Sequence, residues 1–204
     1  NEREGAQCRA ANVLGKLALR NPGSPVIIVN AGAISPLVTL LCSGMASVKA
    51  EAATALSNLS LKSPATQLAI ATGLVGLVGT GSAEAQEHVT QLLNLLSEDA
   101  ENRMAIAKAG AVTRLVNQLR GAGDTSRKAR ELAASVLAHL SEASDENVEA
   151  IAASGGIKPL LGMIAGADAG RSSMAPAKAA AVLSDLARSS AKNRQSILNE
   201  GGIP

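Results

Sequence analysis

The sequence contains no phenylalanine, tyrosine or tryptophan, although 47% of its 204 residues are hydrophobic. Proteins that bind single-stranded nucleic acid usually stack bases on aromatic rings, and tight protein interfaces usually depend on aromatic anchors. This chain can therefore use neither aromatic base stacking nor aromatic interface anchors. Its core must be built from Ala, Leu, Val and Ile, which favours helices that pack closely through small side chains.

Charge of one sign is also scarce, because 19 Lys and Arg balance 17 Asp and Glu. A net charge of +2 without clustered cations argues against nucleic-acid binding, which requires many phosphate contacts. No run approaches the roughly 20 consecutive apolar residues of a membrane span, and no charged-then-apolar leader opens the sequence. We therefore expect no nucleic-acid partner, no membrane insertion and a cytoplasmic or nuclear location.

Residues able to carry out chemistry are few. The two cysteines, Cys8 and Cys42, are predicted to be reduced thiols packed as small hydrophobes. The two histidines, His88 and His139, have no Cys or second His at ligand spacing, which argues against a metal site. The Gly-rich run 121–128 lacks the order of a phosphate-binding loop. We predict no catalytic site, metal or cofactor, and no enzymatic activity.

An eight-residue motif recurs along the chain. It reads AATALSNL at 52–59, and related copies start at residues 10, 89, 133 and 179. Each copy has a small or apolar pair, then a branched pair, then a final Leu, which together form one stripe of a helix. Successive copies are 42, 37, 44 and 46 residues apart. Armadillo and HEAT units have periods of about 40–47 residues, so the spacing predicts a stack of helical repeats.

A second motif keeps step with the first and predicts a three-helix unit. Residues 30–38, 108–116 and 153–161 share a Gly followed by an apolar segment, and another copy begins at Gly201. The Gly can end a short first helix in a left-handed conformation. Pro36 and Pro159 suit the first turn of a second helix. The third, longest helix carries the Ala-Ala motif, and Asn or Asp before each short helix fits an N-cap.

These motifs resemble the armadillo repeat of importin-α, β-catenin and the plant U-box proteins, most clearly from Val26 to Ser60. The resemblance implies an all-α, right-handed α-solenoid with three helices per repeat. One solenoid over 1–204 would hold a partial repeat at 1–20, repeats at about 24–60, 64–97, 101–141 and 147–189, and a partial repeat at 193–204. Neither end is expected to be capped, which predicts a longer array.

One unit departs from the pattern. Between Thr72 and Ser97 the second helix is about four residues short, and four glycines between 73 and 81 weaken helix formation. We therefore expect an irregular second helix there. In the other units the register places the Ala-Ala pair at helix crossings, so that Ala53→Leu would overpack a crossing.

The resemblance also implies a binding surface, because third helices line the concave groove in this family. The motif Asn, which in the family bonds an extended peptide backbone, is present at Asn58, while Leu95 takes one of the equivalent positions. The tryptophan positions of importin-α are also filled by other residues, which disfavours nuclear-signal binding. The candidate groove residues are Arg9, Asn12, Lys16, Glu51, Thr54, Asn58, His88, Gln91, Ser135, His139, Lys178 and Asp185.

The predicted function is a protein–protein interaction scaffold that binds an extended peptide or partner protein along this groove. One alternative is a structural spacer in a large assembly, which would pack through its convex faces and loops. Another is the substrate-recruiting region of a larger enzyme such as a ubiquitin ligase. The sequence leaves the oligomeric state open.

Overall fold

The computed structural model describes residues 2–21, 23–43, 45–60, 64–80, 83–121, 125–165 and 174–201. Within these ranges the chain forms helices and turns and no strand. The helices are α1 (Glu2–Arg20), α2 (Ser24–Asn30), α3 (Ile34–Ser43), α4 (Ala46–Ser60), α5 (Pro64–Leu77), α6 (Ala83–Ser97), α7 (Ala100–Lys108), α8 (Ala111–Leu119), α9 (Arg127–Ala143), α10 (Asp145–Ala153), α11 (Ile157–Ala165), α12 (Met174–Ser189) and α13 (Ala191–Asn199).

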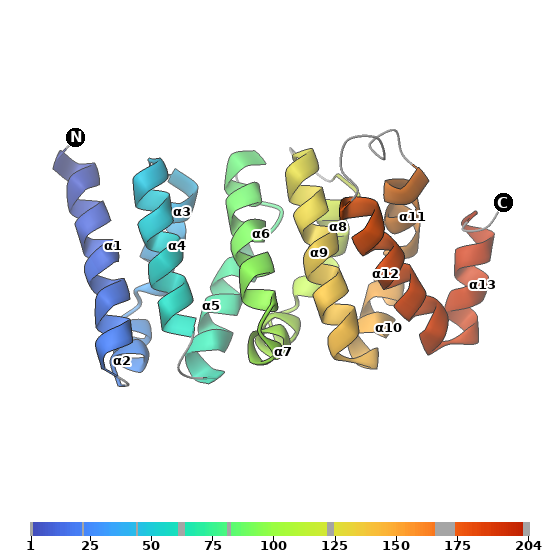
Figure 1. Cartoon of the computed structure of the whole chain (residues 1–204), viewed down its shortest axis with the longest axis horizontal. Helices are drawn as coiled ribbons and strands as arrows, with labels where there is room; N and C mark the ends of the chain where they lie inside the picture. Colours follow the sequence, from blue (N-terminus) through green and yellow to red (C-terminus); the bar gives the residue numbers. More distant parts are fainter. Residues whose placement is uncertain are drawn as a thin grey trace.

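The helices are stacked along one axis as an α-solenoid (Figure 1). Five long helices, α1, α4, α6, α9 and α12, lie side by side and form what we call the third-helix face. Several of the shorter helices, among them α3, α8 and α11, lie behind them, and α13 lies beyond α12 at the C-terminal end (Figure 1). In three units a short first helix (α2, α7, α10) precedes a second helix (α3, α8, α11) and then the long third helix. The predicted all-α solenoid with three-helix units is confirmed.

The predicted glycine turn between first and second helices is also confirmed. Gly32, Gly110, Gly155 and Gly201 all have positive φ, between 72° and 85°. At the end of α10 the Gly155 N–H donates to the Ala152 carbonyl, and the Gly156 N–H donates to the Ile151 carbonyl. This pair of bonds is the Schellman motif, which satisfies helix-terminal carbonyls and turns the chain sharply.

The helix N-caps differ in part from the prediction. Asp99 caps α7 as expected, accepting hydrogen bonds from the N–H groups of the second and third helical residues. The caps of α10 and α13 are instead Ser144 and Ser190, which accept from the N–H groups of Asn147 and Asn193. Serine and asparagine cap helices about equally well, so sequence alone could not place the helix start to the residue.

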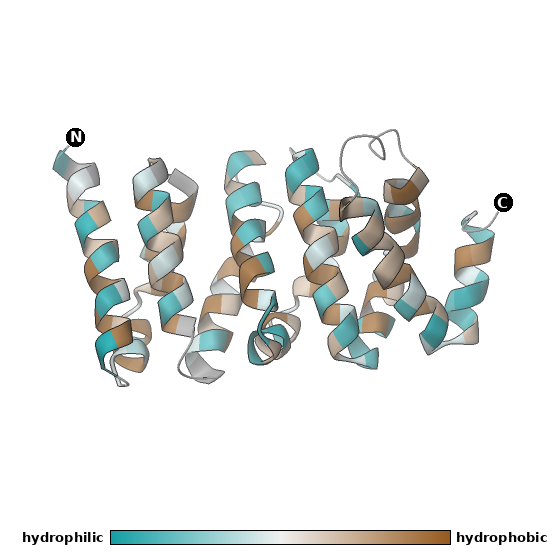
Figure 2. Cartoon of the chain, in the orientation of Figure 1, coloured by the Kyte–Doolittle hydropathy of each residue, from teal (hydrophilic) through white to brown (hydrophobic). Residues whose placement is uncertain are grey.

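The core is continuous and consists of the expected Ala, Leu, Val and Ile side chains. The final Leu of the motif is almost fully buried in four of its five copies: Leu59, Leu96, Leu140 and Leu186. In α1 the equivalent Leu17 is 46% exposed, because no described helix packs on the outer side of α1. Hydrophilic and hydrophobic residues alternate around the long helices, as expected for helices buried on one side (Figure 2).

The two alanines of the motif have different neighbours. Ala52, Ala133 and Ala179, at the first position, have 0% exposure, whereas Ala10 of α1 is exposed. Since α1 has no described helix before it, the first position contacts the preceding part of the stack. The close approach is clearest between α1 and α4, where a Cβ on Gly15 would lie only 3.2 Å from the Ala55 Cα.

The second alanine of the pair faces the following part of the stack. Ala11 and Ala134 are buried, whereas Ala180 is exposed at the end of the array. Ala53 is only half-buried, although another third helix follows it. The expectation that Ala53 lies at a tight crossing is therefore wrong, and the reason is the position of α6.

The unit from 64 to 97 has only two helices, both of them long, whereas the three-helix units have two short helices and one long helix. The chain runs through Gly73 and Gly76 as a single helix, α5, without the left-handed turn of the other units. The expected irregular second helix is therefore wrong. A Cβ on Gly73 would lie 2.9 Å from the Ile34 Cγ2, so this glycine allows α5 to lie against α3. Without a separate second helix, α6 packs on α3 and α9 and makes almost no direct contact with α4.

No single helix of the described residues is long and apolar enough to cross a membrane. Two bent pairs meet the length and composition test together, Ser24–Asn30 with Ile34–Leu41 and Asp145–Ala153 with Ile157–Ala165, at bends of 82° and 85°.

The different surroundings of Ala53 and Ala134 can be tested by one substitution at each position. Ala134→Leu places three more carbon atoms where α9 packs tightly against the following part of the stack. It should lower the free energy of unfolding by about 1–3 kcal/mol. Ala53→Leu extends into open space and should change it by no more than about 0.5 kcal/mol. Urea unfolding followed by circular dichroism measures both, and equal losses would contradict the open α4–α6 junction.

The turn before α11 provides a second test. A Cβ on Gly156 would lie 2.9 Å from the Ile151 carbonyl oxygen and 2.7 Å from its Cγ2. Gly156→Ala should therefore destabilise the fold by about 1–3 kcal/mol. Gly162, within α11, has nothing within 4 Å of its added Cβ. Gly162→Ala should stabilise the fold by about 0.5–1 kcal/mol through helix propensity, and thermal melting compares the two variants.

Candidate functional site

A groove of about 750 Å³ opens on the third-helix face where α4 and α6 fail to meet. It lies between α4 and α6, includes residues at the end of α3 and includes residues in the first half of α9. Its lining residues are Leu41, Met45, Lys49, Ala50, Ala53, Glu84, His88, Gln91, Leu92, Asn94, Leu95, Glu98, Lys128 and Leu132. We call it the α4–α6 groove.

The lining of the groove is largely apolar. Leu41 and Leu92 are buried, while Met45 and Leu95 remain 57% and 52% exposed. Small residues, Ala50 and Ala53, form the wall on α4. A hollow with this composition suits an aliphatic side chain, since burying its carbon atoms removes apolar surface from water on both partners.

Two amide side chains in the groove have hydrogen-bonding capacity left over. The Asn94 Oδ1 atom is buried and has no partner. Gln91, one turn earlier on α6, is exposed, and no described hydrogen bond involves its side chain. Buried polar atoms normally have a partner, so an unpaired Asn94 oxygen beside an open hollow is a good position for a ligand N–H group. Together the two amides can bond the N–H and C=O groups of an extended peptide.

Charged groups of both signs surround the groove. Lys49 of α4 forms an ion pair with Glu84 of α6, which bridges the open junction. The Lys49 ammonium holds the pKa of the Glu84 carboxyl below its usual value through a hydrogen bond and Coulomb attraction. Lys128 and Glu98 also line the groove. The mixed signs mean that the groove does not select strongly for a basic or an acidic ligand.

Only two of the twelve predicted groove residues, His88 and Gln91, line the α4–α6 groove. The sequence reasoning did not include Glu84, Asn94 and Lys128. Glu84 lies one helical turn before His88, and Lys128 lies two turns before Ser135, so extending the predicted stripe toward the helix starts would have found both. Asn94 has no such signal, because its motif position is a partly buried Ser57 in α4.

Several other predicted residues bond neighbouring third helices to one another. The Asn12 Nδ2 atom donates to the Glu51 carboxylate at 2.8 Å, from α1 to α4. Between the same helices the Asn58 Nδ2 atom donates to the Gly15 carbonyl at 3.3 Å. The Asn58 amide, which was predicted to contact a peptide, is instead directed at the adjacent helix.

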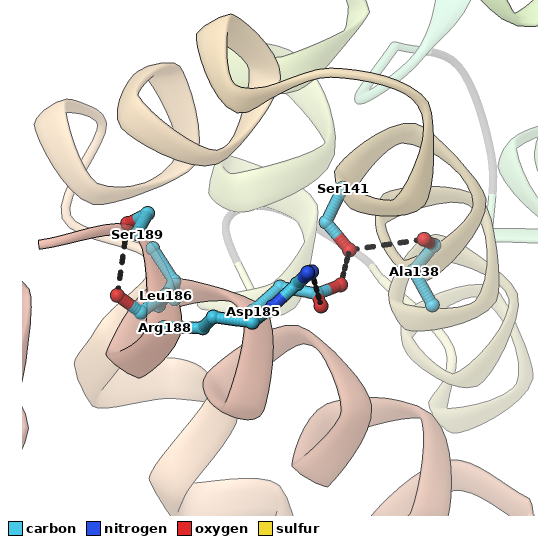
Figure 3. A network of polar contacts seen from close by, with 6 residues as sticks. All are labelled: Ala138, Ser141, Asp185, Leu186, Arg188 and Ser189. Atoms are coloured by element: carbon cyan, nitrogen blue, oxygen red, sulfur yellow. Dashed lines mark hydrogen bonds and ion pairs between the residues drawn. The ribbon is translucent and has the colours of Figure 1, made fainter.

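The same lateral bonding continues at the other end of the array. The Ser97 hydroxyl lies 2.8 Å from the His139 Nδ1 atom, joining α6 and α9. Figure 3 shows the next step, where the Ser141 hydroxyl of α9 donates to the Asp185 carboxylate of α12 at 2.8 Å. Arg188 donates to the other oxygen of that carboxylate. Asn58, His139 and Asp185 share one motif position, so this position carries a row of hydrogen bonds between helices.

The remaining predicted residues are placed as follows. Ser135 is buried, and the Thr54 hydroxyl donates to the Ala50 carbonyl of its own helix. Arg9 and Lys16 are exposed on α1, and Lys178 is half-buried on α12.

Among the described residues, no three His, Cys, Asp or Glu side chains gather closely enough to hold a metal ion. Cys8 is a free, half-buried thiol, and the side chain of Cys42 lies outside the described part of the chain.

Comparison with known proteins identifies the class of this chain. Residues 21–61 match the Armadillo/beta-catenin-like repeat. An engineered protein of known structure is 29% identical, with a TM-score of 0.67 over 98% of this chain and 80% of its own. A designed armadillo repeat protein is 22% identical, with a TM-score of 0.64 over 95% and 81%. Another, solved with the peptide (KR)4, is 22% identical, with a TM-score of 0.65 over 95% and 80%.

The chain is therefore a helical repeat protein with the fold of the designed armadillo repeat proteins. Within it, residues 21–61 match the Armadillo/beta-catenin-like repeat. The comparison with curated proteins gives no match.

The partial burial of His139 makes stability depend on pH. Burial lowers the pKa of His139 below its usual value of 6.5, and the nearby Lys178 lowers it further. The folded state thus favours the neutral imidazole, and this stability is complete above pH 6.5 and lost as the pH falls below it. His139→Asn keeps a hydrogen-bonding group but does not titrate. Its melting temperature should therefore fall less than that of the wild type between about pH 7 and 5, whereas equal falls would contradict this origin.

Proposed function

We propose that the chain is a peptide-binding scaffold whose principal binding surface is the α4–α6 groove, and that it does no chemistry itself. The observation that carries the proposal is the unpaired Asn94 amide beside a hollow with an apolar lining on the third-helix face. The predicted stripe of groove residues contributes through His88 and Gln91. Five other members support the surface by joining adjacent helices: Asn12, Glu51, Asn58, His139 and Asp185.

The proposed ligand is an extended segment of another protein. Its backbone would accept and donate hydrogen bonds at Gln91 and Asn94, and one aliphatic side chain would enter between Ala53 and Leu92. A designed armadillo repeat protein of the same fold has been solved in complex with the peptide (KR)4, which supports a peptide as the ligand. With no aromatic anchor in the chain, we expect moderate affinity, in the micromolar range.

The test is selection of random phage-displayed peptides on the immobilised chain, followed by fluorescence anisotropy of labelled selected peptides. The double variant Gln91→Ala/Asn94→Ala should weaken binding about tenfold, because it removes both amides that face the ligand backbone. Ala53→Arg, which fills the groove from the α4 wall, should abolish binding.

Gln195→Ala serves as the matched control, since it removes an exposed amide on α13 far from the groove. Its affinity should equal that of the wild type. Failure to recover any peptide would contradict the proposal, and so would a set of peptides that bind all variants equally.

A further inference from the structure

A second hollow, of about 610 Å³, lies away from the α4–α6 groove. It is bounded by the end of α8, the first half of α9, the start of α11 and the start of α12. These elements come from two successive units, so the hollow lies at a junction between repeats. Its size falls within the range of roughly 300–1,000 Å³ that is typical of ligand pockets. We call it the α9–α12 pocket.

The pocket has an apolar part. Leu119, Met163 and Ala175 contribute side chains to it, together with Pro159 and Pro176. Leu119 and Ala175 are almost fully buried, whereas Met163 is half-buried and adaptable. Gly162 of α11 has nothing within 4 Å of the place where a Cβ would stand, so the space beside it is open.

The pocket also has an excess of positive charge. Four cations line it, Arg120, Arg127, Arg130 and Lys158, against two carboxylates, Glu131 and Glu200. Arg127 is bonded to Glu131 at 2.9 Å. Arg120 is directed at the carbonyl groups of Ser154 and Gly155 at the end of α10. Two of the four cations are therefore held by the protein itself.

Arg130 differs from these two, because its Nε atom is buried and has no hydrogen-bond partner. Among the described residues, neither Arg130 nor Lys158 forms an ion pair. A buried guanidinium N–H without an acceptor is unfavourable, and a ligand oxygen in the pocket would remove that cost. A carboxylate fits best, since the planar guanidinium can donate two parallel hydrogen bonds to it.

We propose that the α9–α12 pocket binds an acidic segment of a partner protein, in which a Glu or Asp stands beside an aliphatic residue. The carboxylate bonds Arg130 and lies near Lys158, and the aliphatic side chain covers Leu119 and Met163. The apolar part argues for a peptide and against nucleic acid, because the pocket has no aromatic ring on which a base could stack. This site is separate from the α4–α6 groove and does not depend on its function.

The probe is a fluorescently labelled peptide of alternating Glu and Leu, compared with an otherwise identical peptide of Gln and Leu. By anisotropy at low salt, the acidic peptide should bind the wild-type chain at least about tenfold more tightly than the neutral one. Arg130→Gln should abolish that difference. Gly162→Leu, which extends a side chain into the open space beside this glycine, should weaken the binding of both peptides.

Lys108→Gln is the matched control, since it removes one positive charge from the exposed end of α7. It should leave the preference for the acidic peptide unchanged. An acidic peptide that binds Arg130→Gln and Gly162→Leu as well as the wild type would overturn the proposal. Loss of acidic-peptide binding in the Gln91→Ala/Asn94→Ala variant alone would also overturn it, since the peptide would then occupy the α4–α6 groove. Circular dichroism of each variant confirms that loss of binding is not loss of fold.

Discussion

The close approach of neighbouring helices is the interaction on which this structure depends. Without aromatic side chains to fill wide gaps, the core must be packed from Ala, Val, Leu and Ile. The third helices can then bury enough surface only where their backbones come near one another, as at Gly15 and Ala55. The repeated alanines are the condition for that approach, and the leucines that follow them fill the remaining space.

The hydrogen bonds across the third-helix face follow from the same spacing. Helices this close can be joined by short side chains, so Ser97 reaches His139, and Ser141 reaches Asp185. Between α4 and α6, where the helices do not come close, the described cross-connection is the ion pair between the longer side chains of Lys49 and Glu84. The groove and its unpaired Asn94 amide therefore arise from a local loss of packing within an otherwise regular stack.

The regular part of the fold could be read from the sequence because each of its causes is local. A Gly that ends a short first helix and a Leu that closes the repeated motif act in the same way in each regular unit, and Gly155 and Leu140 behave as predicted. The exceptions depend on distant neighbours. The burial of Ala53 is decided by the position of α6, and the loss of the turn at Gly73 involves its contact with Ile34. The partners of Asn58 and Asp185 likewise lie more than forty residues away, at separations of 43 and 44.

The continuous helix α5 has a mechanical consequence. In a stack where each unit contacts only its neighbours, stability is the sum of the units and of the interfaces between them. Adjacent third helices contribute least where α4 and α6 hardly touch, and α5 crosses this junction as one continuous helix of 14 residues. The array therefore consists of two well-packed stacks of helices joined by α5, and it should bend most easily at the junction between them. A ligand in the α4–α6 groove would contact both stacks and restrict their movement relative to each other.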